Sequence, residues 1–425
     1  MLAGFARVEI TPPAGEQPEM MGFGPFLGRT ALETLQPIHL RASYLEEEGG
    51  AALVLSFDLC GLREDLAEAV RRAAAEAAAV GSDRVVATCT HTHSAPSVMP
   101  ILGWGEFDQA TAGRLPGLAA KAAAAAASAA APAAIEGGAT TLDGFSRNRV
   151  YGPNGPRDTM LRTLSFRARE GGKLLGLWAH YTCHPVLLCE QCRVISPDFC
   201  GVAMQTLEAQ QEGAVCSFLQ GYCGDINPTL AHMRQERSIV HLAHFGYRFR
   251  RAVEQAMTTA SAEPDGPVRM LSEKLPLPVA VLSEETIRAF EASAARRAAG
   301  WTRLGPLSAA ALRAEGEKLR KMRQPQREAP IAALGLGEQV LAFHPFEMFT
   351  QIGLDIRAEL GEKAWVVGYA NGYEGYAPTP DRFDPPSGDY AAHGVPLMMG
   401  RHPYSPALGE RLTEGLVQLA RRTRL

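Results

Sequence analysis

The sequence predicts an α/β protein built of layered sheets and helices, and three observations support this class. Short apolar runs typical of buried strands recur along the chain. Stretches rich in alanine and charged residues, typical of helices, lie between them. Several apolar runs are followed by a histidine, an aspartate, a glutamate or a tyrosine. Such residues are typical of the strand ends where open α/β sheets bind ligands.

The predicted strands are short runs rich in valine, leucine and aromatic residues. In chain order they cover residues 51–57, 85–89, 174–181, 214–219, 340–343 and 365–367. The predicted helices alternate with them and cover residues 65–80, 117–131, 198–211, 241–259 and 406–422. The second helix is almost entirely alanine, and Pro132 is expected to mark its end.

Residues 283–327 differ from the rest because they are charged and rich in alanine and arginine, with Trp301 and Leu304 among them. We predict a peripheral helical insertion here, either a hairpin that covers the active site or a solvated excursion without a chemical role. No repeat or linker divides the chain, so a single domain over residues 1–425 is expected.

The bulk composition excludes some partners. The chain has 425 residues, of which 46% are hydrophobic, and carries 42 basic and 46 acidic side chains for a net charge of −4. No basic block stands out, so nucleic acid is not an expected partner. No apolar run is long enough to span a bilayer. Residues 1–10 lack the pattern of a signal peptide, so a cytoplasmic location is expected, while the oligomeric state stays open.

Eight cysteines are present, several of them inside apolar runs where a free thiol acts as a small hydrophobe. Cys189 and Cys192 have the spacing of a zinc or redox pair, and Cys183 and Cys200 flank them. A four-cysteine zinc site is therefore an option, but no second C-x-x-C motif supports it. A structural role is favoured over a metal or redox function.

The pair His91 and His93 directly follows the predicted strand 85–89. In an extended segment, residues two apart point to the same side, so both imidazoles can enter one site. Imidazole is a common zinc ligand and the side chain best suited to proton transfer near pH 7. The alternative is that both are simply polar residues at a strand end.

Other predicted strands end in the same way, at His184, Asp225, Glu347, Tyr373 and Tyr376. Two histidines and one glutamate form a known catalytic zinc set that leaves a position open for water. Each residue also has a simpler interpretation. The histidine precedes a proline and could be a buried structural residue, the aspartate could belong to a turn, and the glutamate could favour a helix start. The tyrosines could be core or rim residues.

Several short segments, taken in their order along the chain, resemble those of the neutral/alkaline ceramidase superfamily, specifically its shorter bacterial members. They include an amino-terminal strand with a proline turn, a Met-Met-Gly-aromatic loop, a His-Thr-His-Ser motif and an Asn-Arg pair. The matching residues are 5–13, 20–24, 90–96, 148–149, 183–185, 195–201, 224–228 and 371–376. The resemblance implies the layered catalytic domain of that family, with a peripheral insertion at about 283–327.

The resemblance also implies roles for individual residues. Zn²⁺ would be bound by His91, His184, Glu347 and Tyr376. His93 would act as acid or base, Arg149 would contact the substrate carbonyl or its oxyanion, and Tyr376 and Asp225 would complete the catalytic set. Residues expected to contact the substrate are Gly22, Phe23, Asn227, Tyr373 and Tyr390. Tyr390 is matched although its spacing from Tyr376 is altered, and His180 is a fallback for His184.

Two departures from the family bear on the substrate. Asn227 stands where the family has a serine, so a mechanism that needs this hydroxyl is excluded, whereas a zinc-bound water can still attack a carbonyl. The chain is also shorter than full ceramidases and is expected to lack their carboxyl-terminal sandwich domain, which points away from ceramide.

The sequence therefore predicts a zinc-dependent hydrolase of a small-molecule carboxamide, such as an N-acyl amide, a lactam or a small peptide-like amide. The bond would be a C–N bond other than a peptide bond. Two alternatives stay open. One is an enzyme that forms an amide or lactam at the same site, and the other is a metal-binding protein without catalysis.

Overall fold

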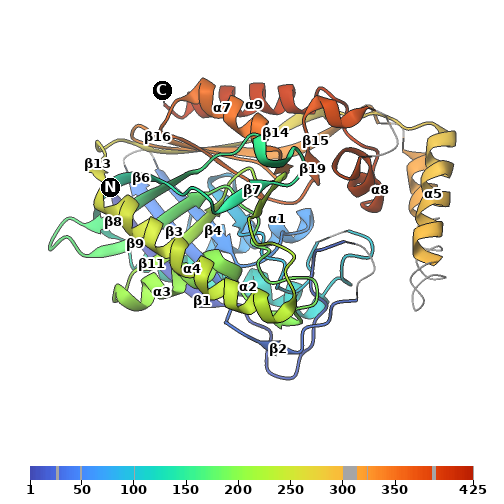
Figure 1. Cartoon of the computed structure of the whole chain (residues 1–425). Coiled ribbons are helices and arrows are strands. Elements are labelled where there is room, and N and C mark those ends of the chain that lie inside the picture. Colours follow the sequence, from blue (N-terminus) through green and yellow to red (C-terminus); the bar gives the residue numbers. More distant parts are fainter. Residues whose placement is uncertain are drawn as a thin grey trace.

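The computed structural model describes residues 1–24, 28–47, 50–99, 101–299, 314–322, 324–384 and 389–424. Within these ranges the chain forms four layers: helices, a large sheet, a smaller sheet and a second layer of helices (Figure 1). This arrangement confirms the predicted α/β class.

The large sheet is mixed, in the order β11-β9-β8-β6-β1-β3-β4-β5, with β13 paired to β6. Only β4–β5 and β9–β11 are parallel pairs among these strands. The strands are β1 (Leu2–Glu9), β3 (His39–Glu47), β4 (Gly50–Phe57), β5 (Val85–Cys89), β6 (Ala131–Thr141), β8 (Met160–Ala168), β9 (Leu174–Tyr181), β11 (Val215–Gln220) and β13 (Ser261–Ala262).

The smaller sheet has the order β14-β15-β16-β18, in which β16 and β18 are parallel. Its strands are β14 (Val268–Pro278), β15 (Gln326–Leu336), β16 (Gln339–Phe343) and β18 (Ala364–Val367). Three short pairings accompany the sheets. They join β17 (Glu347–Met348) to β19 (Tyr376–Ala377), β7 (Ser146–Asn148) to β12 (Ile226–Pro228), and β2 (Glu33–Thr34) to β10 (Val194–Ile195).

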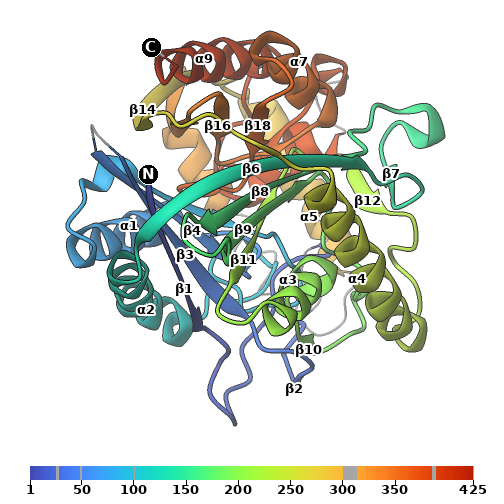
Figure 2. The same cartoon turned by 90° about the vertical axis from the view of Figure 1, so that its left-hand side faces the viewer.

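The two sheets pack face to face on a core that includes Trp178 and Phe166 from the large sheet and Trp365 and Phe343 from the smaller one. The outer face of each sheet is covered by helices (Figure 2). Four helices cover the large sheet: α1 (Glu64–Ala77), α2 (Gln109–Ser128), α3 (Asp198–Gln210) and α4 (Gln235–Thr258). On the smaller sheet lie α7 (Thr350–Leu360) and α9 (Leu408–Arg422).

The predicted strands correspond to β4, β5, β9, β11, β16 and β18, each within one residue at either end. The predicted helices correspond to α1, α3, α4 and α9, with larger differences at their ends. Long strands such as β6, β14 and β15 were not predicted. They contain proline, glycine or many charged residues, and their extended form depends on pairing with neighbours.

The boundaries predicted for the alanine-rich helix are wrong. Helix α2 starts eight residues earlier, at Gln109 instead of 117, because Asp108 caps it by accepting hydrogen bonds from the backbone of Ala110 and Thr111 at 3.1 and 3.3 Å. The helix ends at Ser128. Pro132 does not mark its end, since this residue already lies in β6 and pairs with β1.

The predicted insertion is helical where it is described. Helix α5 (Glu284–Ala299) lies at the edge of the molecule, and residues 314–321 form a further helical segment (Figure 1). Arg320 joins the two through ion pairs with Glu284 and Glu291 at 3.0 and 2.8 Å. Trp301 and Leu304 lie outside the described residues. The predicted end at 327 is two residues too late, because β15 begins at Gln326.

Two further helices, the π-helical turn Tyr390–Gly394 and α8 (Val395–Met398), follow β19. No helix in the described part of the chain combines the length and apolarity that a membrane crossing requires.

A buried ion network joins the large sheet to α3. Arg41 on β3 is 2% exposed and donates to Glu208 and to Asp58, each at 2.9 Å. Arg7 and the backbone amide of Cys216 also donate to Glu208. Burial alone would raise the pKa of Glu208, but Arg41 outweighs it and holds the pKa below its usual 4.5. The charged network therefore stabilises the fold above pH 4.5 and loses this contribution as the pH falls through the lowered pKa.

We predict that Glu208→Gln lowers the free energy of unfolding at pH 7 by about 3–5 kcal/mol, because it leaves buried Arg41 short of one partner. Urea unfolding measures this loss. The difference in unfolding free energy between the variant and the parent protein should shrink when urea unfolding is repeated below pH 4.5. The exposed Glu212 in the same region serves as control, and Glu212→Gln should have no measurable effect. Equal losses in both variants would contradict the assignment.

Candidate active site

The candidate site lies where strand ends from both sheets meet. His91 and His184 follow β5 and β9 of the large sheet, and each of these strands belongs to a parallel pair. Glu347 opens β17 just after β16 of the smaller sheet, and a loop from Tyr369 to Tyr376 follows β18. A hydrogen bond of 2.7 Å from the Asn371 amide to the Ala87 carbonyl joins this loop to β5.

Three potential metal ligands converge there. The Nε2 atoms of His184 and His91 lie 3.1 and 3.4 Å from Oε2 of Glu347. All three side chains are 1% exposed, and their ligand atoms lie within 4.8 Å of one another. The structure therefore brings together the two histidines and the glutamate that the resemblance implied as ligands, and the side chain of Tyr376, the fourth, contacts the same glutamate.

Both histidines are oriented by backbone carbonyls. Nδ1 of His91 lies 2.6 Å from the Cys60 carbonyl oxygen, and Nδ1 of His184 lies 2.9 Å from that of Ile226. Since a carbonyl can only accept, each Nδ1 carries the proton and donates it. Each Nε2 then faces Glu347, where it can bind a metal ion once it is unprotonated. The hydrogen bonds at Nδ1 fix the orientation of both rings. Two imidazole Nε2 atoms and a carboxylate form a donor set that suits a divalent metal such as zinc.

The charges of the cluster favour a bound cation. Burial, followed by Arg149, lowers the pKa of His184 to about 4, so this imidazole is neutral at pH 7. Burial would raise the pKa of Glu347, but His91 and His184 hold it well below its usual 4.5, so the carboxylate is ionised. Burial opposes protonation of His91, yet Cys60 and Glu347 raise its pKa to about 10, so without a bound cation this imidazole holds a second proton that balances the charge of Glu347. A metal ion at this position would take the place of that proton.

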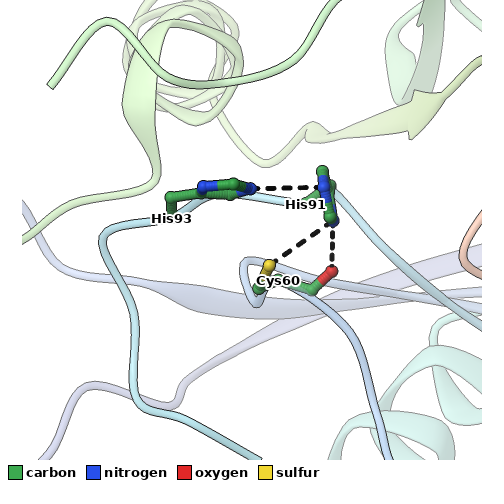
Figure 3. A group of neighbouring side chains, drawn as sticks. All are labelled: Cys60, His91 and His93. Carbon is green, nitrogen blue, oxygen red and sulfur yellow. Dashed lines mark hydrogen bonds between the residues drawn. The ribbon is translucent and has the colours of Figure 1, made fainter. Parts of the chain in front are cut away.

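His93 lies beside this cluster and forms, with His91 and Cys60, a second group of possible metal ligands among the described residues. Its Nε2 is 3.2 Å from Nε2 of His91, and its Nδ1 has no hydrogen-bond partner among the described residues. Burial, together with His91 and His184, lowers its pKa well below the usual 6.5. His93 is therefore a neutral base next to the candidate metal position. Figure 3 shows the two imidazoles and Cys60.

Cys60 was missed by the sequence analysis. Its Sγ lies 3.5 Å from Nδ1 of His91, in addition to the contact made by its carbonyl group. A signal was present, because Cys60 stands three residues after the end of β4, as His184 does after the end of β9. Tyr369 was also missed. Its ring stacks on that of His91 with the centroids 4.0 Å apart.

Arg149 and two tyrosines lie on another side of the cluster. Tyr373 donates a hydrogen bond of 2.5 Å to Oε1 of Glu347. Arg149 donates to the hydroxyl oxygen of Tyr376 at 2.9 Å and to the Gly224 carbonyl at 2.7 Å. Tyr376 pairs with Glu347 in the register of β17 and β19. The Arg149 side chain is partly exposed, so it can meet an incoming ligand.

The residues expected to contact substrate surround this site. Tyr390 is 43% exposed, and its ring lies 5.7 Å from that of Tyr376, so its altered spacing does not remove it from the site. Phe23 packs against His93 with the ring centroids 5.0 Å apart, and Gly22 abuts the same imidazole. Nδ2 of Asn227 lies 3.4 Å from Nε2 of His232, a residue that no motif had indicated.

Asp225 stands apart from the converging ligands. Its carboxylate accepts hydrogen bonds from the amide and hydroxyl of Thr350 at 2.8 and 2.6 Å, and from Asn148 at 2.7 Å. Its carbonyl accepts from the Arg149 amide at 2.8 Å. These contacts favour a role in placing Arg149 over the direct catalytic role that the resemblance implied.

The other candidate ligands lie elsewhere. Nε2 of His180 is 2.9 Å from the Val366 carbonyl oxygen, and this histidine belongs to neither group of converging ligands in the described residues. The sulfurs of Cys189 and Cys192 are 3.5 Å apart. In the described ranges they do not combine with Cys183 and Cys200 into a metal-binding group. The four-cysteine zinc site is therefore not formed.

The layered fold and the buried histidine–glutamate cluster define a hydrolase with a potential metal centre. Residues 1–242 match the family described as neutral/alkaline non-lysosomal ceramidase, N-terminal, and the chain belongs to this family. It is therefore an amidohydrolase that acts on a C–N bond other than a peptide bond.

Two solved structures share the fold. The neutral ceramidase from Pseudomonas aeruginosa is 21% identical with a TM-score of 0.76, and the match covers 100% of this chain and 74% of that one. A ceramidase complexed with C2 is 19% identical with a TM-score of 0.77, covering 100% and 75%. Among curated proteins no match was found.

The family match and the structure cover different parts of the site. His91, His93, Arg149 and His184 lie within residues 1–242, whereas Glu347 lies beyond them. The fold alone therefore brings the carboxylate to the histidines.

Gly22 allows a direct test of the position of His93. A Cβ atom at Gly22 would lie 2.3 Å from Nδ1 of His93, so Gly22→Ala should displace the imidazole. We predict a loss of about tenfold or more in kcat with unchanged metal content, since small misplacements of reacting groups are costly. Gly24→Ala is the matched control, because both glycines have φ above +100° but a Cβ at Gly24 meets nothing within 4 Å. Equal losses would show that backbone strain, not His93, is responsible.

Proposed function

We propose that the protein is a zinc-dependent amidohydrolase that cleaves a small-molecule carboxamide, with His91, His184, Glu347 and Tyr376 as the metal ligands. The observation that carries this proposal is the orientation of both ligand histidines. Each donates its Nδ1 proton to a backbone carbonyl and directs its Nε2 toward one buried carboxylate. When bound, zinc would supply a Lewis acid that activates water and polarises the substrate carbonyl.

The protein side chains handle the proton and the developing charge. His93 is neutral at pH 7 and has a free ring nitrogen, so it takes the proton from the attacking water and passes it to the leaving amine. Arg149 and the Tyr376 hydroxyl are held 2.9 Å apart and stabilise negative charge on the former carbonyl oxygen. Asn227 has no hydroxyl to contribute, and none of these steps needs one.

The substrate proposed is a small amide rather than a peptide. The family acts on a non-peptide C–N bond, and one structural neighbour is a ceramidase complexed with C2. The partly exposed Tyr390 and Arg149 offer an aromatic face and a cation at the entrance for the groups next to the amide. Because ligands come from residues 91 to 376, we further propose that the chain works as one catalytic domain.

Removal of a ligand histidine tests the metal site. We expect His91→Ala and His184→Ala each to abolish metal binding and turnover, because each removes one of three converging ligand atoms. Metal analysis of the purified protein and amine release from a panel of N-acyl amides measure both properties. His244→Ala changes an exposed residue of α4 and should retain metal and activity. Full activity of the doubly substituted protein would contradict the proposal.

His93→Ala separates proton transfer from metal binding. We expect this variant to keep one zinc per chain and to lose about 10²–10⁴-fold in kcat, the usual contribution of general acid–base catalysis. Stopped assays of amine release, together with metal analysis, report the two effects. If the variant lost its metal, His93 would be a ligand. If the parent protein bound zinc but cleaved no amide in the panel, a metal-binding protein without catalysis would be indicated.

A further inference from the structure

We propose that Glu374 is a positioning residue that holds the site loop, defined as residues 369–376, in register with the metal ligands. The inference rests on the function proposed above, because it concerns how that site is kept in place. Glu374 does not touch the converging ligands and was not among the residues predicted to act in the site.

The site loop contributes several contacts to the cluster from a short stretch of chain. Tyr369 stacks on His91, Tyr373 donates to Glu347, and Tyr376 accepts from Arg149. The backbone of this loop is unusual for so short a segment. Tyr369 and Asn371 have φ angles of 56° and 59°, values that residues other than glycine rarely adopt. Such a backbone persists only where surrounding contacts hold it.

Two anchors hold the loop from outside. Asn371 forms the first, because its amide donates to the Ala87 carbonyl at 2.7 Å and its side chain accepts from the Ala87 amide at 2.9 Å. This anchor fixes the first half of the loop to β5. The second half needs its own anchor, since Tyr373 and Tyr376 follow Asn371.

Glu374 forms the second anchor. Its side chain is 1% exposed and accepts hydrogen bonds from Arg327 at 2.7 Å and from Arg401 and Tyr404 at 2.8 Å. Its amide donates to the Pro345 carbonyl at 2.8 Å, and the next residue, Gly375, accepts from the Glu347 amide at 2.9 Å. The residue thus links the loop backbone to the segment that carries the ligand carboxylate.

The partners of Glu374 come from outside the metal site. Arg327 stands at the start of β15, directly after the helical insertion, and Arg401 and Tyr404 precede α9. The segment 401–404 contacts the base of the insertion, since the Ala280 amide donates to the Pro403 carbonyl and His402 contacts that of Leu319. Glu374 therefore ties the site loop to the base of the insertion.

A charge-neutral replacement tests this role. Glu374→Gln keeps the shape of the side chain but removes the charge that binds both arginines. We expect kcat to fall about 10–100-fold while KM changes less than threefold and one zinc per chain is retained, because the tyrosines shift against bound substrate. The visible spectrum of the cobalt-substituted protein should also change, since Tyr373 donates to the ligand Glu347. Glu338→Gln, which removes an exposed carboxylate paired with Lys363, should leave kcat and spectrum unchanged.

A second variant covers the case in which Glu374→Gln does not fold. Arg327→Gln removes one partner at a position that is 30% exposed and should lower kcat in the same direction, with Arg327→Lys restoring part of the loss. Suppose that the parent protein binds metal and is active. If Glu374→Gln then had the kcat and the cobalt spectrum of the parent protein, this inference would be overturned and the proposed function would stand. The same result in Arg327→Gln would decide the question if only that variant folds. A parent protein that binds no metal would instead overturn the proposed function.

Discussion

The candidate site depends on one buried carboxylate, which lies beside histidines from another sheet. Glu347 comes from the smaller sheet, whereas His91 and His184 follow strands of the large sheet. An ionised carboxylate at this depth is stable only with positive charge beside it, and the Nε2 atoms of both histidines face the same position. Docking of the two sheets therefore creates the site, and the apolar core between them fixes the distances on which the chemistry relies.

Around this centre, the protein separates the groups that react from the groups that orient them. Backbone carbonyls of Cys60 and Ile226 set the histidine tautomers, and Asp225 holds the segment of Arg149. The proposed function does not need the hydroxyl of the family serine, and Asn227 at this position contacts His232.

Sequence patterns predicted the α/β class and which residues lie near one another, but not how the sheets are arranged. The strand-end rule placed His91, His184, Glu347 and Tyr376 near one another because parallel strands bring their carboxyl ends to one edge. The roles assigned to them came from family resemblance. The rule could not reveal that two sheets would face each other, since β14 and β15 carry charged residues and prolines and lack a strand signature. Similarly, helix propensity misplaced α2, because the cap at Asp108 and the pairing of β6 set its ends.

The distribution of the ligands along the chain has a consequence for biogenesis. An emerging polypeptide presents both histidines long before the carboxylate at 347 leaves the ribosome, since synthesis runs from the amino terminus. Contacts so distant in sequence form late in folding. Under the proposed function, tight capture of an ion would be reserved for the finished molecule, because a truncated product that stops after residue 242 has the family signature without Glu347.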